Sequence, residues 1–175
     1  MRKIVVSCLA AAVDEPISWR AALTCMMKAV VESIGKVGSR VRLGNHELVF
    51  DQPRTVPDGE DRGPSPLDVM SAALAACAHY FAAAYLQGRD LPPEGLVVEV
   101  ASEKQRAPVS RIARLAITVR APAGLDARHL AGIERAIKSC PAYGTLLHPP
   151  VVEVSVERAD AQVGYDSRMT NTGGA

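Results

Sequence analysis

The feature that most limits how this chain can fold is the apolar segment GPSPLDVMSAALAACAHYF, residues 63–81. Two prolines lead into it, its alanine-rich run extends to about Gln87, and Gly88 ends it. Asp68 and His79 interrupt the segment too much for a good membrane span. A helix that is apolar all round needs cover on every side. We therefore expect the central helix of a globular domain, covered in part by a second copy of the chain.

Composition excludes several classes of function. The 175 residues suit one domain, and at 48% hydrophobic residues they can bury a substantial core. A net charge of +1, the lack of a dense basic run and an aromatic content of 4% argue against nucleic-acid binding. Four cysteines, with no CxxC pair and no histidine at metal spacing, argue against a disulfide scaffold and a metal site. We expect no cofactor.

The N-terminal part, residues 1–36, is expected to be an extension of the domain. Its opening MRKIVVSCLAAAVDEP reads as a strand over Ile4–Leu9, although a signal peptide with the same features stays open. Apolar residues at helical spacing predict an amphipathic helix over 18–34, which Gly35 ends. On the strand interpretation we expect a cytoplasmic protein.

The remaining pattern predicts an α+β domain over residues 37–158, followed by a flexible tail over 159–175. The expected elements after the extension are a hairpin over 40–50 turning at Gly44-Asn45, a polar loop over 51–63, the long helix, strands over 95–103 and 111–121, a helix capped by Asp126, and a last strand over 149–157. Strands that follow one another without helical crossovers indicate an antiparallel or mixed sheet packed on helices.

Two cysteines carry the candidate chemistry. Cys77 lies within the long helix. Cys140 shares the apolar face of the helix that Asp126 caps, and it directly precedes Pro141, which must end that helix. Either cysteine alone is most simply a small core residue, and His79 is expected to be a buried, hydrogen-bonded histidine. If the sulfurs meet, one thiolate can reduce a peroxide and become a sulfenic acid, which the second thiol converts to a disulfide. Cys77 lies about 15 Å from the start of its helix, so its activation requires a basic side chain from elsewhere.

The segments GPSPLDVMSAALAAC and CPAYGTL resemble the OsmC/Ohr family of thiol-dependent peroxidases over residues 38–157. The family places a cysteine eleven residues after a helix-leading proline, as Pro66 and Cys77 stand here, and a second cysteine in a Cys-Pro context, as in Cys140-Pro141. The resemblance implies an OsmC-like fold with two central helices, in an intertwined homodimer with active sites at the subunit interface.

The resemblance also implies the reaction. Cys77 would be the peroxidatic nucleophile and Cys140 the resolving thiol. Substrates would be organic or fatty-acid hydroperoxides, and a dithiol such as dihydrolipoamide would be the reductant.

The sequence departs from the family pattern at the residue after the motif proline. Family members hold an activating arginine with a glutamate there, whereas this chain has Leu67 and then Asp68, which we expect to face the helix dipole instead. Arg40 is our preferred activating cation. The other basic residues considered are Lys36, Arg42, Arg54 and Arg62.

Two classes of function therefore stay open. The paired cysteines favour a peroxidase, and the missing glutamate favours a dimer without turnover that senses redox state or binds an apolar small molecule.

Overall fold

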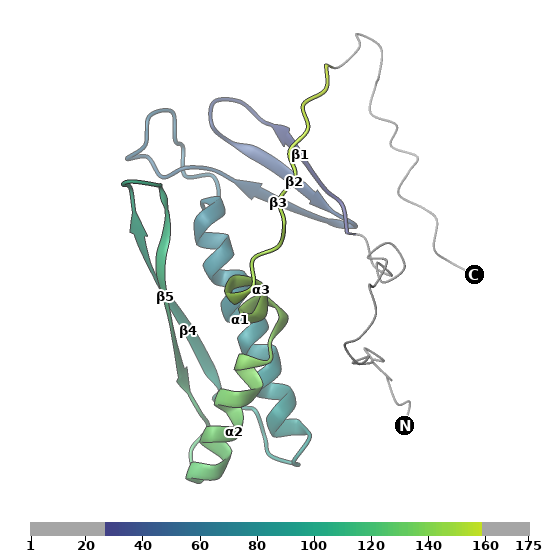
Figure 1. Ribbon diagram of the computed structural model, residues 1–175, viewed down its shortest axis with the longest axis vertical. Helices are drawn as coiled ribbons and strands as arrows, with labels where there is room; N and C mark the ends of the chain where they lie inside the picture. Colours follow the sequence, from purple (N-terminus) through teal and green to yellow (C-terminus); the bar gives the residue numbers. More distant parts are fainter. Residues whose placement is uncertain (1–26, 159–175) are drawn as a thin grey trace, which may run out of the picture.

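The computed structural model describes residues 27–158 (Figure 1). Three strands form one antiparallel sheet in the order β1-β2-β3: Ala29–Ser33, Ser39–Leu43 and His46–Phe50. A polar loop leads to helix α1, Pro66–Gln87, which is followed by an antiparallel hairpin of β4, Val97–Gln105, and β5, Arg111–Arg120. Helices α2, Ala127–Lys138, and α3, Pro141–Leu147, complete the described elements.

Local sequence signals account for the start and end of α1. The Ser65 side chain caps its N-terminus by accepting a hydrogen bond from the N–H of Asp68. Pro66 occupies the first turn, where its missing N–H leaves no helical bond unmade. The backbone N–H of Gly88 bonds to the carbonyls of Ala84 and Leu86 and closes the helix. The predicted boundaries of this helix are therefore confirmed.

The core lies where α1, α2 and the β4–β5 hairpin meet. Ala78 and Ala82 are fully buried and let the neighbouring elements approach α1 closely. Leu86, Ile133 and Ile137 fill the space between them, and each contributes about 1.5–3 kcal/mol by leaving water. In Figure 1 the β4–β5 hairpin lies alongside α1, while the three-stranded sheet stands near the N-terminal end of that helix. This core fixes the middle of α1 and the end of α2 relative to each other.

The α+β class, the 40–50 hairpin with its Gly44-Asn45 turn, and the antiparallel strands after α1 are confirmed. The helix over 18–34 is wrong where the structure can test it, because residues 29–33 form β1 and pair with β2. The adjacent valines Val30 and Val31 fit a pleated strand, and their spacing to Ile34 imitates a helical stripe. The expected domain boundary after residue 36 thus falls in the turn between two paired strands. The strand at Ile4–Leu9 and the tail over 159–175 lie outside the described residues.

The last predicted strand is also wrong for the single chain. Residues 150–158 form no regular element, and Val152, Val154 and Val156, which a strand would place on one face, are 79%, 84% and 93% exposed. Alternating valines make a strand only beside a sheet edge that pairs with them. No described strand of the same chain pairs with this segment.

One described helix, α1, is long and apolar enough to cross a membrane. It packs against α2, α3 and β4, as a core helix of a globular domain does.

Candidate active site

The two cysteines predicted from the sequence lie side by side. The Sγ of Cys140 donates a hydrogen bond to the Sγ of Cys77 across 2.7 Å, and both are free thiols. Cys77 is half-buried in the middle of α1, whereas Cys140 is 1% exposed. The two sulfurs are therefore close enough to react with each other without a movement of the backbone.

The chain between α2 and α3 places Cys140. We expected this residue on the apolar face of the preceding helix, but α2 ends at Lys138 and Cys140 caps the start of α3 in an extended conformation. Pro141 explains the change, because a residue before proline is driven out of the helical region. The proline then occupies the first position of α3. This break between α2 and α3 lets the buried sulfur of Cys140 reach Cys77 on α1.

Burial controls the protonation of Cys77. Loss of solvent raises the pKa of its thiol above the ordinary value of 9.0, and the neighbouring Cys140 sulfur raises it further. The backbone N–H of Ala142, in the first turn of α3, bonds to the Cys77 sulfur and acts in the opposite direction. The chain by itself therefore keeps Cys77 protonated at neutral pH, and a thiolate there needs a further positive charge.

Arg40, the preferred activating cation, is not brought to the sulfurs within one chain. It lies on β2, where its Nε is 3.0 Å from a carboxylate oxygen of Glu47 on β3. That nitrogen is buried without a well-directed hydrogen bond. The three-stranded sheet that carries Arg40 has no extensive packing on the described helices.

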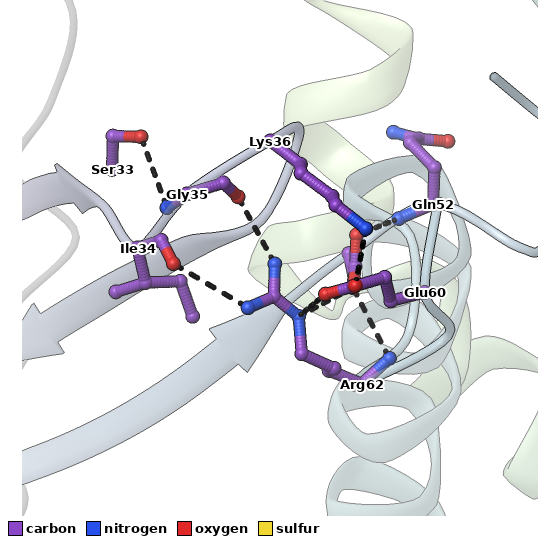
Figure 2. Close-up of polar contacts among 8 residues, drawn as sticks. Ser33, Ile34, Gly35, Lys36, Gln52, Glu60 and Arg62 are labelled. Atoms are coloured by element: carbon purple, nitrogen blue, oxygen red, sulfur yellow. Dashed lines mark hydrogen bonds and ion pairs between the residues drawn. The ribbon is translucent and has the colours of Figure 1, made fainter. Parts of the chain in front are cut away.

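Arg62 is committed to a different task, which the sequence did not reveal (Figure 2). Its Nε lies 2.9 Å from Oδ2 of Asp51, a residue that is 1% exposed. Its two terminal nitrogens donate to the carbonyls of Ile34 and Gly35 in the β1–β2 turn. Arg62 therefore fastens the loop 51–63 to the three-stranded sheet.

The same cluster contains a second ion pair. Glu60 bonds to Lys36 at 2.6 Å and lies 3.2 Å from Arg62. The guanidinium of Arg62 holds the pKa of Asp51 at about 2, with the N–H groups of Gln52 and Arg62 assisting. Lys36 and Arg62 are thus both engaged by carboxylates close to the start of α1.

The first turn of α1 lacks the glutamate of the family pattern, and Leu67 and Asp68 follow Pro66 instead. Leu67 is half-buried in a cleft beside the helix. Asp68 accepts hydrogen bonds from Ser65 Oγ at 2.6 Å and from Lys104 Nζ at 2.7 Å, and both contacts lower its pKa. Asp68 stands in the first turn of α1, the position from which we expected it to face the helix dipole, and Ser65 is the residue that caps the helix.

Among the side chains after Cys77 on α1, that of His79 differs from expectation. His79 is exposed rather than buried, because two residues of helix rotate it by about 200° from Cys77. Tyr80 is 62% exposed and meets Phe81 edge-on. Tyr85 is half-buried and reaches α2 through His129 Nδ1 at 3.4 Å.

Two clefts, each of about 540 Å³, lie beside β5. One lies between β5 and α2, where its charged residues Glu134 and Lys138 neutralise each other at 2.6 Å. The other lies between the first turn of α1, the start of β5 and the end of α3. Within residues 27–158, no group of three or more His, Cys, Asp and Glu side chains has the arrangement of a metal site.

A family model described as OsmC-like protein matches residues 59–155, more than half of the chain. The chain belongs to the OsmC-like family. The matched range contains both cysteines, the loop end with Arg62 and both clefts. No curated protein matches the chain.

Solved structures agree with this fold. The chain is similar to an OsmC-like protein from Mycoplasma pneumoniae with a TM-score of 0.62 and 16% identity, covering 71% of this chain and 89% of that one. It is similar to an organic hydroperoxide resistance protein OsmC from Legionella pneumophila with a TM-score of 0.52 and 19% identity, covering 70% and 90%. OhrB of Bacillus subtilis, an organic hydroperoxide resistance protein, gives 0.51 and 16%, covering 69% and 90%. At these identities the likeness shows the OsmC-like fold.

Proposed function

We propose that the protein is a thiol-dependent peroxidase that reduces organic, fatty-acid-type hydroperoxides. The observation that carries the proposal is the 2.7 Å separation of the Cys77 and Cys140 sulfurs. Two similar structures bear the name organic hydroperoxide resistance protein, which supports the same reaction class.

The reaction is a two-electron reduction of the peroxide. The Cys77 thiolate attacks the terminal oxygen of ROOH, the O–O bond breaks, and the leaving alkoxide takes a proton to become the alcohol. Cys77 is then a sulfenic acid. The sulfur of Cys140 attacks that of Cys77, the S–O bond breaks, and water leaves with a proton, so that a Cys77–Cys140 disulfide remains. Because Cys140 lies in contact before the reaction starts, this second step needs no rearrangement.

Regeneration requires an external dithiol of the lipoyl type. One of its thiols attacks the disulfide, and its second thiol releases the enzyme by closing a ring, which returns both cysteines to thiols. A reducing cytoplasm supplies such thiols, and we place the protein there.

Activation of Cys77 is assigned to Arg40 of a second copy in a homodimer. The three-stranded sheet that carries Arg40 has no extensive packing on the described helices of its own chain. The four exposed valines in the segment after α3 offer an apolar, strand-like surface for the same association. A cation delivered across the interface offsets the burial that raises the pKa of Cys77.

Turnover with cumene hydroperoxide and dihydrolipoamide tests the proposal. Cys77→Ser is expected to lower kcat/KM by at least ~10³-fold, because no other residue replaces the nucleophile. Cys140→Ser is expected to allow one turnover and then stop. Cys25→Ser is the matched control and is expected to retain full activity. Equal activity of the Cys77→Ser and Cys25→Ser proteins contradicts the proposal.

The second candidate is a dimer that senses redox state or binds an apolar small molecule without turnover. Leu67 in place of the family glutamate and the raised pKa of Cys77 favour it. The two candidates differ in the rate of continuous hydroperoxide reduction. A sensor reduces at most one equivalent of hydroperoxide as its disulfide forms and is not recycled by excess dithiol, and a binding protein reduces none.

A further inference from the structure

The cleft at the start of β5 has features that the sulfur chemistry does not use. Its walls are apolar side chains from three elements: Leu67 and Met70 from α1, Ile112 from β5, and Leu146 and Leu147 from α3. The exposed fractions of the Met70 and Leu147 side chains are 53% and 59%. Apolar surface open to water in a concave site marks a place where an apolar group binds.

A β-bulge shapes one wall of this cleft. Glu103 pairs with Arg114 and Lys104 with Ile112, which leaves Ala113 without a partner. A bulge re-aims side chains on the bulged strand, and such features are frequent beside active sites. All residues from 110 to 115 border the cleft, so the start of β5 forms one continuous wall of it.

The cleft also carries a positive charge. Arg114 is paired with Glu103 at 2.7 Å. Arg111 makes no ion pair with any described carboxylate, and its one polar contact is to the carbonyl of Ile112 at 3.3 Å. The site therefore combines an apolar wall with one guanidinium that can bind a carboxylate.

Both helices lead from the sulfurs to this cleft. Met70 and Cys77 are seven residues apart on α1, so they share a helix face about 10 Å apart. Leu147 follows Cys140 by the same interval along α3. A chain-like ligand anchored at Arg111 would thus run along apolar side chains toward the reacting sulfur.

We propose that this cleft selects hydroperoxides that carry a free carboxylate, with Arg111 binding the carboxylate and the apolar wall holding the hydrocarbon chain. The inference rests on the proposed peroxidase function and adds the specificity-determining residue to it. Arg111 acts on binding and does not touch the reacting oxygen atoms.

Steady-state kinetics with a matched pair of substrates test the proposal. Linoleic acid hydroperoxide ends in a carboxylate, and its methyl ester ends in a neutral ester on the same hydrocarbon chain. Arg111→Gln is expected to raise KM for the acid about tenfold, as the loss of one charge-assisted hydrogen bond does, and to leave kcat and the ester unchanged. Arg111→Lys is expected to restore most of the affinity. The control is Arg120→Gln, which removes an arginine on the same strand that pairs with Glu99 and does not line the cleft.

Equal KM values for acid and ester in the wild-type protein, or an equal effect of Arg111→Gln on both, overturn the proposal. Calorimetric titration with decanoate separates this outcome from failure of the peroxidase proposal, because it needs no turnover. If no hydroperoxide is reduced, decanoate binding that weakens about tenfold in Arg111→Gln still supports the cleft. Absence of decanoate binding, as when a second copy of the chain covers the cleft, or equal binding to both proteins, overturns it.

Discussion

At the scale of single residues, a carboxylate buried as deeply as Asp51 requires partners on every side. It has them in the guanidinium of Arg62 and in the N–H groups of Gln52 and Arg62, at 2.8 Å and 3.2 Å from its two oxygens. Removing any one partner from a buried charge costs more than the bond itself contributes, because the remaining charge stays out of water. The cluster thus makes the loop before α1 a defined part of the fold.

Asp51→Asn is predicted to lower the melting temperature by several degrees at pH 7, since it leaves Arg62 without its buried partner. The folded pKa of Asp51, about 2, lies below the ordinary 3.8. Its ionised form therefore contributes stability above pH ~4, and this contribution is lost as the pH falls through about 2. Thermal unfolding of wild type and variant at a series of pH values is the measurement.

The difference between wild type and Asp51→Asn should narrow steadily below pH ~4. Asp58→Asn, an exposed carboxylate of the same loop, is the control and should change the melting temperature little. A difference that stays constant down to pH 2, or an equal loss in the control, contradicts this account of the cluster.

Sequence reasoning reached part of the site at this scale. Cys77 and Cys140 were identifiable because each stands in a local motif, one after Pro66 and one before Pro141. The Asp51–Arg62 pair has no local pattern, since its meaning depends on how a loop returns to the β1–β2 turn. In the proposed dimer, the position of Arg40 relative to Cys77 depends on a second copy, which the pattern of one chain does not encode.

At the scale of elements, the contact of α1 with α2 depends on one glycine. A Cβ on Gly132 would lie 1.9 Å from Oη of Tyr85 and 2.0 Å from Cζ. The guanidinium of Arg89 stacks on the Tyr85 ring at 3.7 Å from the ring centre, and His129 forms a hydrogen bond with the Tyr85 hydroxyl. The ring is held in place and cannot turn aside freely.

Gly132→Ala is therefore predicted to destabilise the protein by about 1–3 kcal/mol, although alanine is the better helix former. Gly144→Ala is the matched control, because a Cβ on Gly144 in α3 meets no atom within 4 Å. This control should be neutral or stabilising by up to about 1 kcal/mol. Urea unfolding of the two variants is the measurement, and an equal change in both would contradict the close packing of α1 on α2.

Elements with complete local signals were predicted well. The start of the long helix at Pro66, the cap at Asp126 and the Gly44-Asn45 turn all lie where expected. The errors fall on residues 29–33 and 150–158, whose backbone partners are distant in the sequence or belong to no described strand of this chain. Hydrophobic spacing alone did not distinguish a helix from a strand in the first segment and did not supply a sheet edge in the second.

At the scale of the whole molecule, the proposed site is shared between two copies. Both cysteines come from one chain, and Arg40 is assigned to the other. A C2 dimer then contains two equivalent sites, each needing one cysteine pair and one partner arginine.

Co-expression of two differently tagged chains tests this arrangement. Cys77→Ser and Arg40→Gln homodimers are each predicted to be nearly inactive. The purified heterodimer of these two chains should recover about half of wild-type activity, because one of its two sites is intact. The Cys77→Ser and Cys140→Ser pair is the control and should recover none, since both sulfurs belong to one chain. Recovery in the control, or its absence in the first pair, contradicts the assignment.

The central claim is that Cys77 and Cys140 form a working pair, and intact mass with peptide mapping after one equivalent of cumene hydroperoxide tests it most directly. The account predicts rapid formation of a Cys77–Cys140 disulfide, and a trapped sulfenic or higher oxidised Cys77 in the Cys140→Ser protein. Slow oxidation spread over all four cysteines, and unchanged by either substitution, would contradict it.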